Sequence, residues 1–373
     1  MNFDHLYRRA LDLEPLSIDD AELLYQVAPT SELMFVAWQI RQKFHPGYTA
    51  TWMIDRNINI TNVCISGCKF CNFHCKINSD KTYTTTIEEY KSKIEVMQQL
   101  GGNQLLIQGG MHPQYGLEFY TDLFSQLKSA FPNVKLHALG PPEIVHIARK
   151  ERMPYRLVLE KLIAAGLESL PGAGAEILSD RVRKEISPGK ARTSEWLEVM
   201  AEAHQLGMVT SATMMFGHIE TLRERIEHLV LLRDLQSKKP DASPGFMAFI
   251  PWPIMSEGTE LGRMVQLNHV LPVEYIRTIA ICRMVLNNIP NIQASWLTIG
   301  KETAQVCLHA GANDLGSIMI EENVVSAAGA SFKLSALEMQ RTIAEAGFNP
   351  QLRAQDYKFI DLPSVVEKYI AKS

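Results

Sequence analysis

Four of the six cysteines in the 373-residue chain fall within twelve residues, at Cys64, Cys68, Cys71 and Cys75. The first three have the spacing C-x3-C-x2-C. In a reducing compartment, thiols clustered in this way indicate metal binding rather than disulfides. Three thiolates can ligate three irons of a [4Fe–4S] cube and leave the fourth iron open for a reactant. The spacing therefore predicts a catalytic metal centre at Cys64, Cys68 and Cys71.

A structural zinc site is the alternative for these cysteines, with Cys75 as its fourth ligand. Structural zinc sites usually pair two cysteine knuckles across a long spacer, and four thiols on one short loop would be strained around a tetrahedral ion. A protein built around such a site would be a zinc-binding scaffold rather than an enzyme. We favour the open cluster, and Cys75 is either a further ligand or a bystander.

Strand-like runs alternate with helix-like segments from about Ala50 onward, which is typical of a parallel sheet with helical crossovers. One example is the segment that begins with a Thr86/Glu89 capping box and stops at Gly101. Eight strand–helix units predict an α/β fold, a (β/α)8 barrel of the TIM type, and a doubly wound open sheet is the alternative. The eight runs are Ala50–Ile54, Asn103–Ile107, Val134–Leu139, Leu167–Leu170, Val209–Met215, Gly245–Ile250, Asn291–Leu297 and Asn313–Ile320.

The length of the chain suits one barrel with additions. We expect an N-terminal helical extension over residues 1–48, the barrel over residues 49–330, and a helical tail over residues 331–373 packed on the barrel. Barrel enzymes hold their reactants at the carboxyl ends of the strands. The cysteines follow the first predicted strand, so they are expected at that face.

Composition and charge narrow the class of partner. The 37 basic and 41 acidic residues give a net charge of −4, which argues against nucleic acid or anionic lipid as a partner. No run of about 20 apolar residues could span a bilayer. Residues 1–10 lack the apolar segment of a secretory signal. We therefore expect a cytoplasmic protein that binds neither nucleic acid nor membrane.

The cysteine spacing after a first barrel strand, with Phe70 before the last cysteine, resembles the motif of the radical S-adenosylmethionine (SAM) superfamily. The resemblance implies a [4Fe–4S] cluster whose open iron binds the amino and carboxylate groups of SAM. Electron transfer from the reduced cluster would cleave SAM to methionine and a 5′-deoxyadenosyl radical. An electron donor such as flavodoxin or ferredoxin is then an expected partner.

Turns at the strand ends are the expected SAM contacts. A Gly-Gly-Glu motif stands after the second strand of radical SAM enzymes, and this chain has Met111 in place of the acid. Glycines there allow the backbone to approach a ligand closely, although an ordinary tight turn is the alternative. Glu176 follows the fourth strand, where a carboxylate could instead stabilise a helix start. The residues predicted to bind the cofactor are Phe70, Phe73, Gln108, Gly109, Gly110 and Glu176, with barrel packing as the alternative for Phe73.

Two polar residues after the fifth strand are candidate catalytic groups. His218 and Glu220 are expected at the barrel mouth, where either could act as a base. A structural histidine with satisfied hydrogen bonds is the alternative.

Carboxylates near other strands are candidate substrate contacts. Asp314 lies in the last strand, which ends at Glu321 and Glu322, and such a polar strand is unusual for core packing. Glu143 follows the third strand. We expect these four residues to contact substrate, and the alternatives are a solvated rim for the first three and a helix start for Glu143.

Segments beyond the cysteines narrow the resemblance to the family of cyclic dehypoxanthine futalosine synthases in menaquinone biosynthesis. Aminodeoxyfutalosine synthases and the radical SAM enzymes that build a deazaflavin chromophore share much of the pattern and are the alternatives. The segments that carry the resemblance are 55–59, 64–71, 108–113, 171–176, 215–220, 248–253, 291–296, 311–317 and 321–325.

This resemblance implies dehypoxanthine futalosine as the small-molecule substrate. The adenosyl radical would remove the C4′ hydrogen of its ribose, and the carbon radical would add to the tethered benzoate ring. Loss of an electron and a proton would then restore aromaticity. The predicted acceptors for that proton are His218, Glu220 and Asp314.

Overall fold

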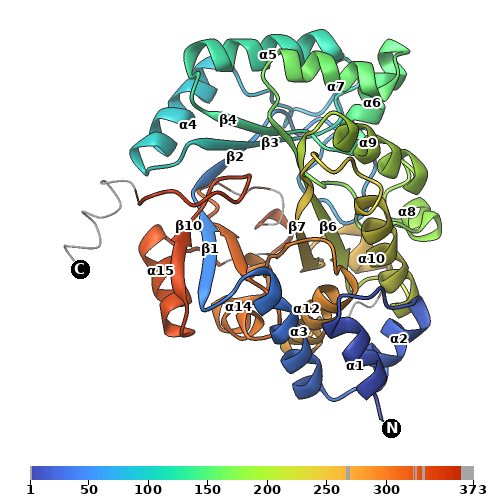
Figure 1. Cartoon of the computed structure of the whole chain (residues 1–373). Coiled ribbons are helices and arrows are strands. Elements are labelled where there is room, and N and C mark those ends of the chain that lie inside the picture. The colour runs from blue at the N-terminus through green and yellow to red at the C-terminus, as the bar shows by residue number, and fades with distance from the viewer. Residues whose placement is uncertain (1, 266–268, 322, 324–325, 330–331, 363–373) are drawn as a thin grey trace.

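Parallel strands surrounded by helices form the centre of the molecule (Figure 1). This computed structural model describes residues 2–265, 269–321, 323, 326–329 and 332–362. Seven strands pair in the order β2-β3-β4-β5-β6-β7-β8, and three pair in the order β10-β1-β9. The strands are β1 (Thr49–Met53), β2 (Asp55–Asn59), β3 (Gln104–Gln108), β4 (Lys135–Ala138), β5 (Ser169–Leu170), β6 (Val209–Phe216), β7 (Gly245–Pro253), β8 (Asn291–Ile292), β9 (Asp314–Ser317) and β10 (Asn349–Leu352).

The two sheets join into one closed ring. β1 continues into β2 through Ile54, and Thr51 in β1 pairs with Asp314 in β9. Gln293, directly after β8, forms a parallel bridge with Asp314 and completes the circuit. The first barrel strand is thus split into β1 and β2, and β3 to β9 supply the other seven. This closure confirms the predicted (β/α)8 barrel and excludes the open sheet.

Helices cover the outside of the ring (Figure 1). α4 illustrates why they form: Thr86 and Glu89 make the predicted capping box, and the buried side chains Tyr90, Ile94 and Met97 recur at helical spacing. The helices after β2 are α4 (Ile87–Gln99), α5 (Leu117–Ala130), α6 (Pro141–Glu151), α7 (Tyr155–Ala164), α8 (Asp180–Ile186), α9 (Thr193–Gln205), α10 (Leu222–Gln236), α11 (Glu260–Met264), α12 (Pro272–Val285), α13 (Trp296–Ile299), α14 (Lys301–Leu308), the 3-10 turn η1 (Ser326–Ala328) and α15 (Ala336–Glu345).

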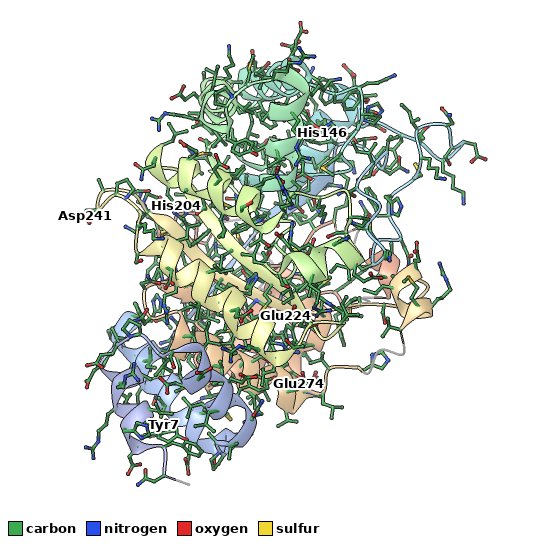
Figure 2. All side chains as sticks on the ribbon, turned by 90° about the vertical axis from the view of Figure 1, so that its right-hand side faces the viewer. Tyr7, His146, His204, Glu224, Asp241 and Glu274 are labelled. Atoms are coloured by element: carbon green, nitrogen blue, oxygen red, sulfur yellow. The ribbon has the colours of Figure 1, made fainter. Side chains whose placement is uncertain are left out.

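Three helices precede the barrel: α1 (Asp4–Leu11), α2 (Ile18–Val27) and α3 (Thr30–Phe44). They pack on the outside against α10 and α12. Figure 2 shows this arrangement from the side, with Tyr7 on α1 at the lower end, Glu274 on α12 and Glu224 on α10 above it, and His204 on α9 and His146 on α6 farther up. None of the helices in the described part of the chain combines the length and hydropathy that crossing a bilayer requires.

The described part of the predicted C-terminal tail contains a helix and a strand. β10 follows α15 and pairs in parallel with β1, with Thr49 opposite Asn349 and Trp52 opposite Leu352. The expectation of an entirely helical tail is therefore wrong for residues 349–352. The physical reason is that β3 pairs with β2 and leaves one edge of β1 free, so β10 satisfies backbone groups that would otherwise be buried without partners. The proposed domain boundaries themselves stay a prediction.

Candidate active site

A cavity of about 390 Å³ lies inside the barrel and extends to the cysteine loop. Part of its wall comes from alternate residues of the strands, because successive side chains of a strand point to opposite faces, and the rest comes largely from the loops that follow the strands. Polar and apolar side chains both contribute. The lining residues that β2, β6 and β7 contribute are Asp55, Asn57, Ser211, Thr213, Ala248, Ile250 and Trp252.

Cys64, Cys68 and Cys71 line one part of this cavity, whereas Cys75 is not among the lining residues. Ser66 Oγ lies 2.9 Å from Cys64 Sγ and 3.2 Å from Cys68 Sγ, so the loop brings these sulfurs toward one another. Three thiols at the edge of an open space fit a [4Fe–4S] cube with one free iron. Within the described ranges, no group of three or more His, Cys, Asp or Glu side chains is arranged to hold a metal ion.

Cys68 and Cys71 differ in acidity. Burial raises the pKa of Cys68 to about 11. Burial also acts to raise the pKa of Cys71, but hydrogen bonds to His74 and to backbone groups outweigh it, and the pKa is lowered. The same hydrogen bond to Cys71 raises the pKa of His74. Cys71 is therefore the readier thiolate, and Cys68 must release a proton when metal binds.

Gly110 is needed where the second strand's turn meets the cysteine loop. A Cβ at this position would lie 2.2 Å from Val63 O and 2.9 Å from Cys64 Cβ. Gly110 N donates to Thr61 O at 2.7 Å, which holds the two segments together. The close approach that glycine allows is therefore to the protein's own cysteine loop. Gly109 and Gly110 also line the cavity, so their predicted contact with SAM stays a prediction.

Glu176, Lys190 and Phe70 form a charged and aromatic group on the cavity wall. Lys190 Nζ lies 2.5 Å from Glu176 Oε1 and 5.2 Å from the centre of the Phe70 ring. Burial acts to lower the pKa of Lys190, but the acidic groups of Cys68, Glu176 and Glu143 outweigh it and raise the pKa. Lys190 therefore keeps its proton and holds a positive charge near Cys68. Nothing in the sequence pattern had singled out Lys190.

Glu143 lies in the first turn of α6 and lines the cavity. Its Oε2 is buried and has no hydrogen-bond partner among the described residues. Burial raises the pKa of this carboxyl to about 7. Glu143 thus lies at a helix start, as the structural interpretation predicts, and also lines the cavity, as a substrate contact would.

His218 and Glu220 are not among the residues that line the cavity, and their side chains are fully buried. His218 Nε2 donates to Met215 O at 3.0 Å, and its Nδ1 accepts from Ile219 N at 2.8 Å. Glu220 accepts from Gly217 N at 2.7 Å and from His218 N at 2.9 Å. This corrects the expectation that the two residues face the barrel mouth, because the loop after β6 turns both side chains back onto itself.

Two of the three predicted carboxylates at the last strand also lie away from the cavity lining. Asp314 is fully buried beneath Arg353, with Arg353 Nε 2.6 Å from Asp314 Oδ2 and Nη2 2.9 Å from Oδ1. Glu321 pairs with Arg56 at 2.8 Å and with Lys93. Both carboxylates are therefore held by cations of the protein. Glu322 lies outside the described residues.

Asp55 and Asn57 are cavity residues that the sequence analysis did not assign to the site, although segment 55–59 carries part of the family resemblance. A signal was present, because polar residues occur at alternate positions of the strand that leads to the cysteines. Alternation in a barrel strand places one set of side chains inside. Tyr357 and Arg353 also line the cavity, and they come from the segment after β10, whose position follows only from its pairing with β1.

Comparison with known proteins adds independent evidence. A family model of the radical SAM superfamily matches residues 58–232, and a model described as the CofH/MqnC C-terminal region matches residues 243–366. The chain is 42% identical to a cyclic dehypoxanthine futalosine synthase of Streptomyces coelicolor, over 92% of this chain and 85% of that protein. It is 39% identical to a 5-amino-6-(D-ribitylamino)uracil–L-tyrosine 4-hydroxyphenyl transferase of Archaeoglobus fulgidus, over 88% of this chain and 94% of the other.

A solved structure supports the fold. Methylornithine synthase superimposes with a TM-score of 0.68 and 19% identity, covering 94% of this chain and 98% of that one. The barrel, the three cavity-facing cysteines and the relatives agree, and the chain belongs to the radical SAM superfamily, in the group whose members carry a CofH/MqnC C-terminal region.

Proposed function

We propose that this chain is a cyclic dehypoxanthine futalosine synthase that converts dehypoxanthine futalosine to its cyclic product in menaquinone biosynthesis. The observation that carries the proposal is the likeness, over nearly the whole chain, to an enzyme of that name. Cys64, Cys68 and Cys71 hold the [4Fe–4S] cluster that radical SAM enzymes use. When bound, the cluster and SAM supply a radical that removes the C4′ hydrogen of the substrate ribose.

The cavity wall next to the cysteines is the proposed SAM site. Glu176 is kept in place by Lys190, so it can accept a hydrogen bond from a cationic or hydroxyl group of SAM. Gly109 and Gly110 offer backbone groups to the methionine end. All the proposed contacts line the same cavity as the cysteines, namely Phe70, Phe73, Gln108, Gly109, Gly110 and Glu176.

The substrate is proposed to lie in the barrel interior beside SAM. Trp252 lines the cavity near the end of β7 and presents an aromatic face that suits the benzoate ring. The cyclisation needs the ring held against C4′, and the strands around the cavity limit access by water and other hydrogen donors. Proton acceptance belongs to a cavity-lining group, and the described candidates are Asp55, Glu143 and His137.

We infer that a one-electron donor such as flavodoxin or ferredoxin reduces the cluster and that the protein works in the cytoplasm. The cysteines in the structure are free thiols, and thiol ligands persist in a reducing compartment. Both inferences rest on the chemistry of the cluster.

An anaerobic assay tests the proposed function. The protein is reconstituted with iron and sulfide, reduced, and given SAM and dehypoxanthine futalosine, and mass spectrometry follows the products. We expect 5′-deoxyadenosine and a product two hydrogens lighter than the substrate. Cys68→Ala should abolish both, and Cys75→Ala is the matched control because Cys75 does not line the cavity. Formation of 5′-deoxyadenosine without the cyclic product would contradict the proposal and direct the assay to the enolpyruvyl substrate of aminodeoxyfutalosine synthase.

A further inference from the structure

The floor of the cavity consists of Asp55, Asn57, Ser317, Arg353 and Tyr357, which lie where β2 begins and where β9 and β10 end. β2 runs from Asp55 to Asn59 and then leads into the cysteine loop. At about 3.3 Å per residue, Asp55 lies roughly 13 Å below the end of that strand. Asp55 thus lies below the proposed cluster and SAM site, and Asn57 lies between Asp55 and that site, two residues nearer the end of β2.

Three polar atoms of the floor have no hydrogen-bond partner among the described residues. Ser317 Oγ donates to Asp55 Oδ1, but no hydrogen bond from the described residues reaches Asp55 Oδ2. Asn57 Oδ1 and the Tyr357 hydroxyl are buried and equally unpartnered within those residues. Buried polar atoms without partners are uncommon in folded proteins, and one that lines a cavity indicates a ligand.

The basic side chains near the floor already have hydrogen-bond partners within the protein. Arg353 binds both oxygens of Asp314, and its Nη1 donates to Ala354 O at 3.2 Å. His137 lies beside the floor with Nδ1 2.7 Å from Ser169 Oγ, and burial lowers its pKa to about 3, so its ring is neutral. Asp55 is therefore the floor's acidic group whose second oxygen accepts no hydrogen bond from the described residues, and the charge of Arg353 acts on it without a direct contact.

We propose that Asp55 and Asn57 bind hydroxyl groups of the substrate's sugar, so that the sugar enters the barrel first and the aromatic carboxylate stays toward the mouth. This inference rests on the proposed function. Free carboxylate and amide oxygens require O–H or N–H donors, and a ribose presents several hydroxyl groups. A benzoate carboxylate has no donor and would be repelled by Asp55.

The same arrangement argues against a purely structural role for the two residues. A structural carboxylate would use both oxygens within the protein, as Asp314 does with Arg353. Asp55 lines the cavity and uses Oδ1 to bind Ser317, while Oδ2 accepts no hydrogen bond from the described residues. Ser317 is therefore the positioning residue that orients Asp55 toward the ligand.

SAM also contains a ribose, so the experiment must separate the two sugars. Equilibrium binding is measured on the reconstituted protein without reductant, where no turnover occurs, using dehypoxanthine futalosine and an analogue with hydrogen in place of the 2′ and 3′ hydroxyls. Asp55→Asn and Asn57→Leu are compared with wild type. Glu321→Gln is the matched carboxylate control, since Glu321 does not line the cavity.

We expect Asp55→Asn to weaken binding of the natural substrate by about tenfold or more, the loss typical of a charged hydrogen bond. The deoxy analogue should bind wild type and variant alike, and SAM affinity should not change. Asn57→Leu should follow the same pattern, which protects the test if one variant folds poorly. The assignment would be overturned if Asp55→Asn weakened binding of the natural substrate and the deoxy analogue equally, or if it weakened only the binding of SAM. Absence of futalosine binding to wild type, with SAM still bound, would instead overturn the proposed function.

Discussion

The loop after β6 and the floor of the cavity each contain a buried carboxylate, but the two carboxylates differ in how many of their oxygens are hydrogen-bonded by the protein. Glu220 in the loop accepts from two backbone N–H groups and pairs with Arg225 at 2.8 Å. Asp55 in the floor lines the cavity and has one oxygen bound to Ser317, while the other accepts no hydrogen bond from the described residues. The chemical group is the same, and only its surroundings differ.

This contrast teaches how to separate structural from functional acids. A buried carboxylate whose acceptor sites are filled by the protein has little capacity left for a ligand, and it stabilises the fold. A carboxylate with a free oxygen in a cavity can bind a donor. His218 and Glu220 have the residue types of an acid–base pair, yet their hydrogen bonds already occupy them.

The largest effect is expected from replacing a cysteine that lines the cavity. Cys68→Ala should reduce formation of 5′-deoxyadenosine at least about a thousandfold, because the residues of one catalytic unit act together. Iron content and the absorbance of the cluster should fall in parallel, and circular dichroism should show an intact barrel. Full activity with undiminished iron would contradict the ligand assignment.

The next largest effect is expected on the free energy of unfolding, from a change in the loop after β6. Glu220→Gln should lower the free energy of unfolding by about 3–5 kcal/mol, because Arg225 loses its buried partner. Denaturant titration of variant and wild type measures the loss. SAM affinity should be unchanged, and a selective loss of SAM binding would place Glu220 in the site after all.

The free energy of unfolding that Glu220→Gln loses should depend on pH, which tests the structural role of Glu220 further. Burial acts to raise the pKa of Glu220, but His218, Arg225 and backbone N–H groups outweigh it and hold the pKa below its usual 4.5. A carboxyl with a lowered pKa stabilises the fold above the unfolded value, and this contribution disappears as the pH falls through the folded value. The stability difference between wild type and Glu220→Gln should therefore be full at pH 6 and should shrink below about 4.5. A difference that grows on acidification would contradict the assigned direction.

A smaller effect is expected where the two strand-end loops touch. Gly110→Ala places a methyl group 2.2 Å from Val63 O, and the strain should cost about 1–3 kcal/mol and displace the cysteine loop. Iron bound per chain should fall, as measured after reconstitution. Gly207→Ala is the control, because its φ of +71° strains any side chain while a Cβ there would meet no atom within 4 Å. An equal loss of iron in both variants would contradict a specific role for the contact at Gly110.

The last comparison is between two tyrosine hydroxyls, and it includes the smallest expected effect. The Tyr275 hydroxyl donates to Pro251 O at 2.8 Å and accepts from Ser295 N at 2.9 Å, so Tyr275→Phe should cost about 1–3 kcal/mol. The Tyr357 hydroxyl has no partner among the described residues, so Tyr357→Phe should stay within about 0.5 kcal/mol of wild type. Chemical denaturation of both variants checks the order, and a reversed order would contradict the distinction between paired and free groups.

The sequence by itself determined the features that depend on local pattern. The spacing of Cys64, Cys68 and Cys71 predicted the thiol site, because the three cysteines lie on one short loop and its residue Ser66 contacts two of the sulfurs. The capping box at Thr86 and the periodic apolar residues after it predicted α4. Eight alternating units predicted the barrel, because strand and helix periodicities are local properties.

Only the tertiary structure decided which polar groups are free. Asp314 is occupied because Arg353 reaches it from 39 residues further along the chain, next to a strand that the sequence pattern did not reveal. Asp55 is free because no distant residue of the described chain occupies its second oxygen, and Lys190 approaches Glu176 from a separate segment. A polar side chain has the same local signal whether it is paired or free, and its partner is set by long-range packing.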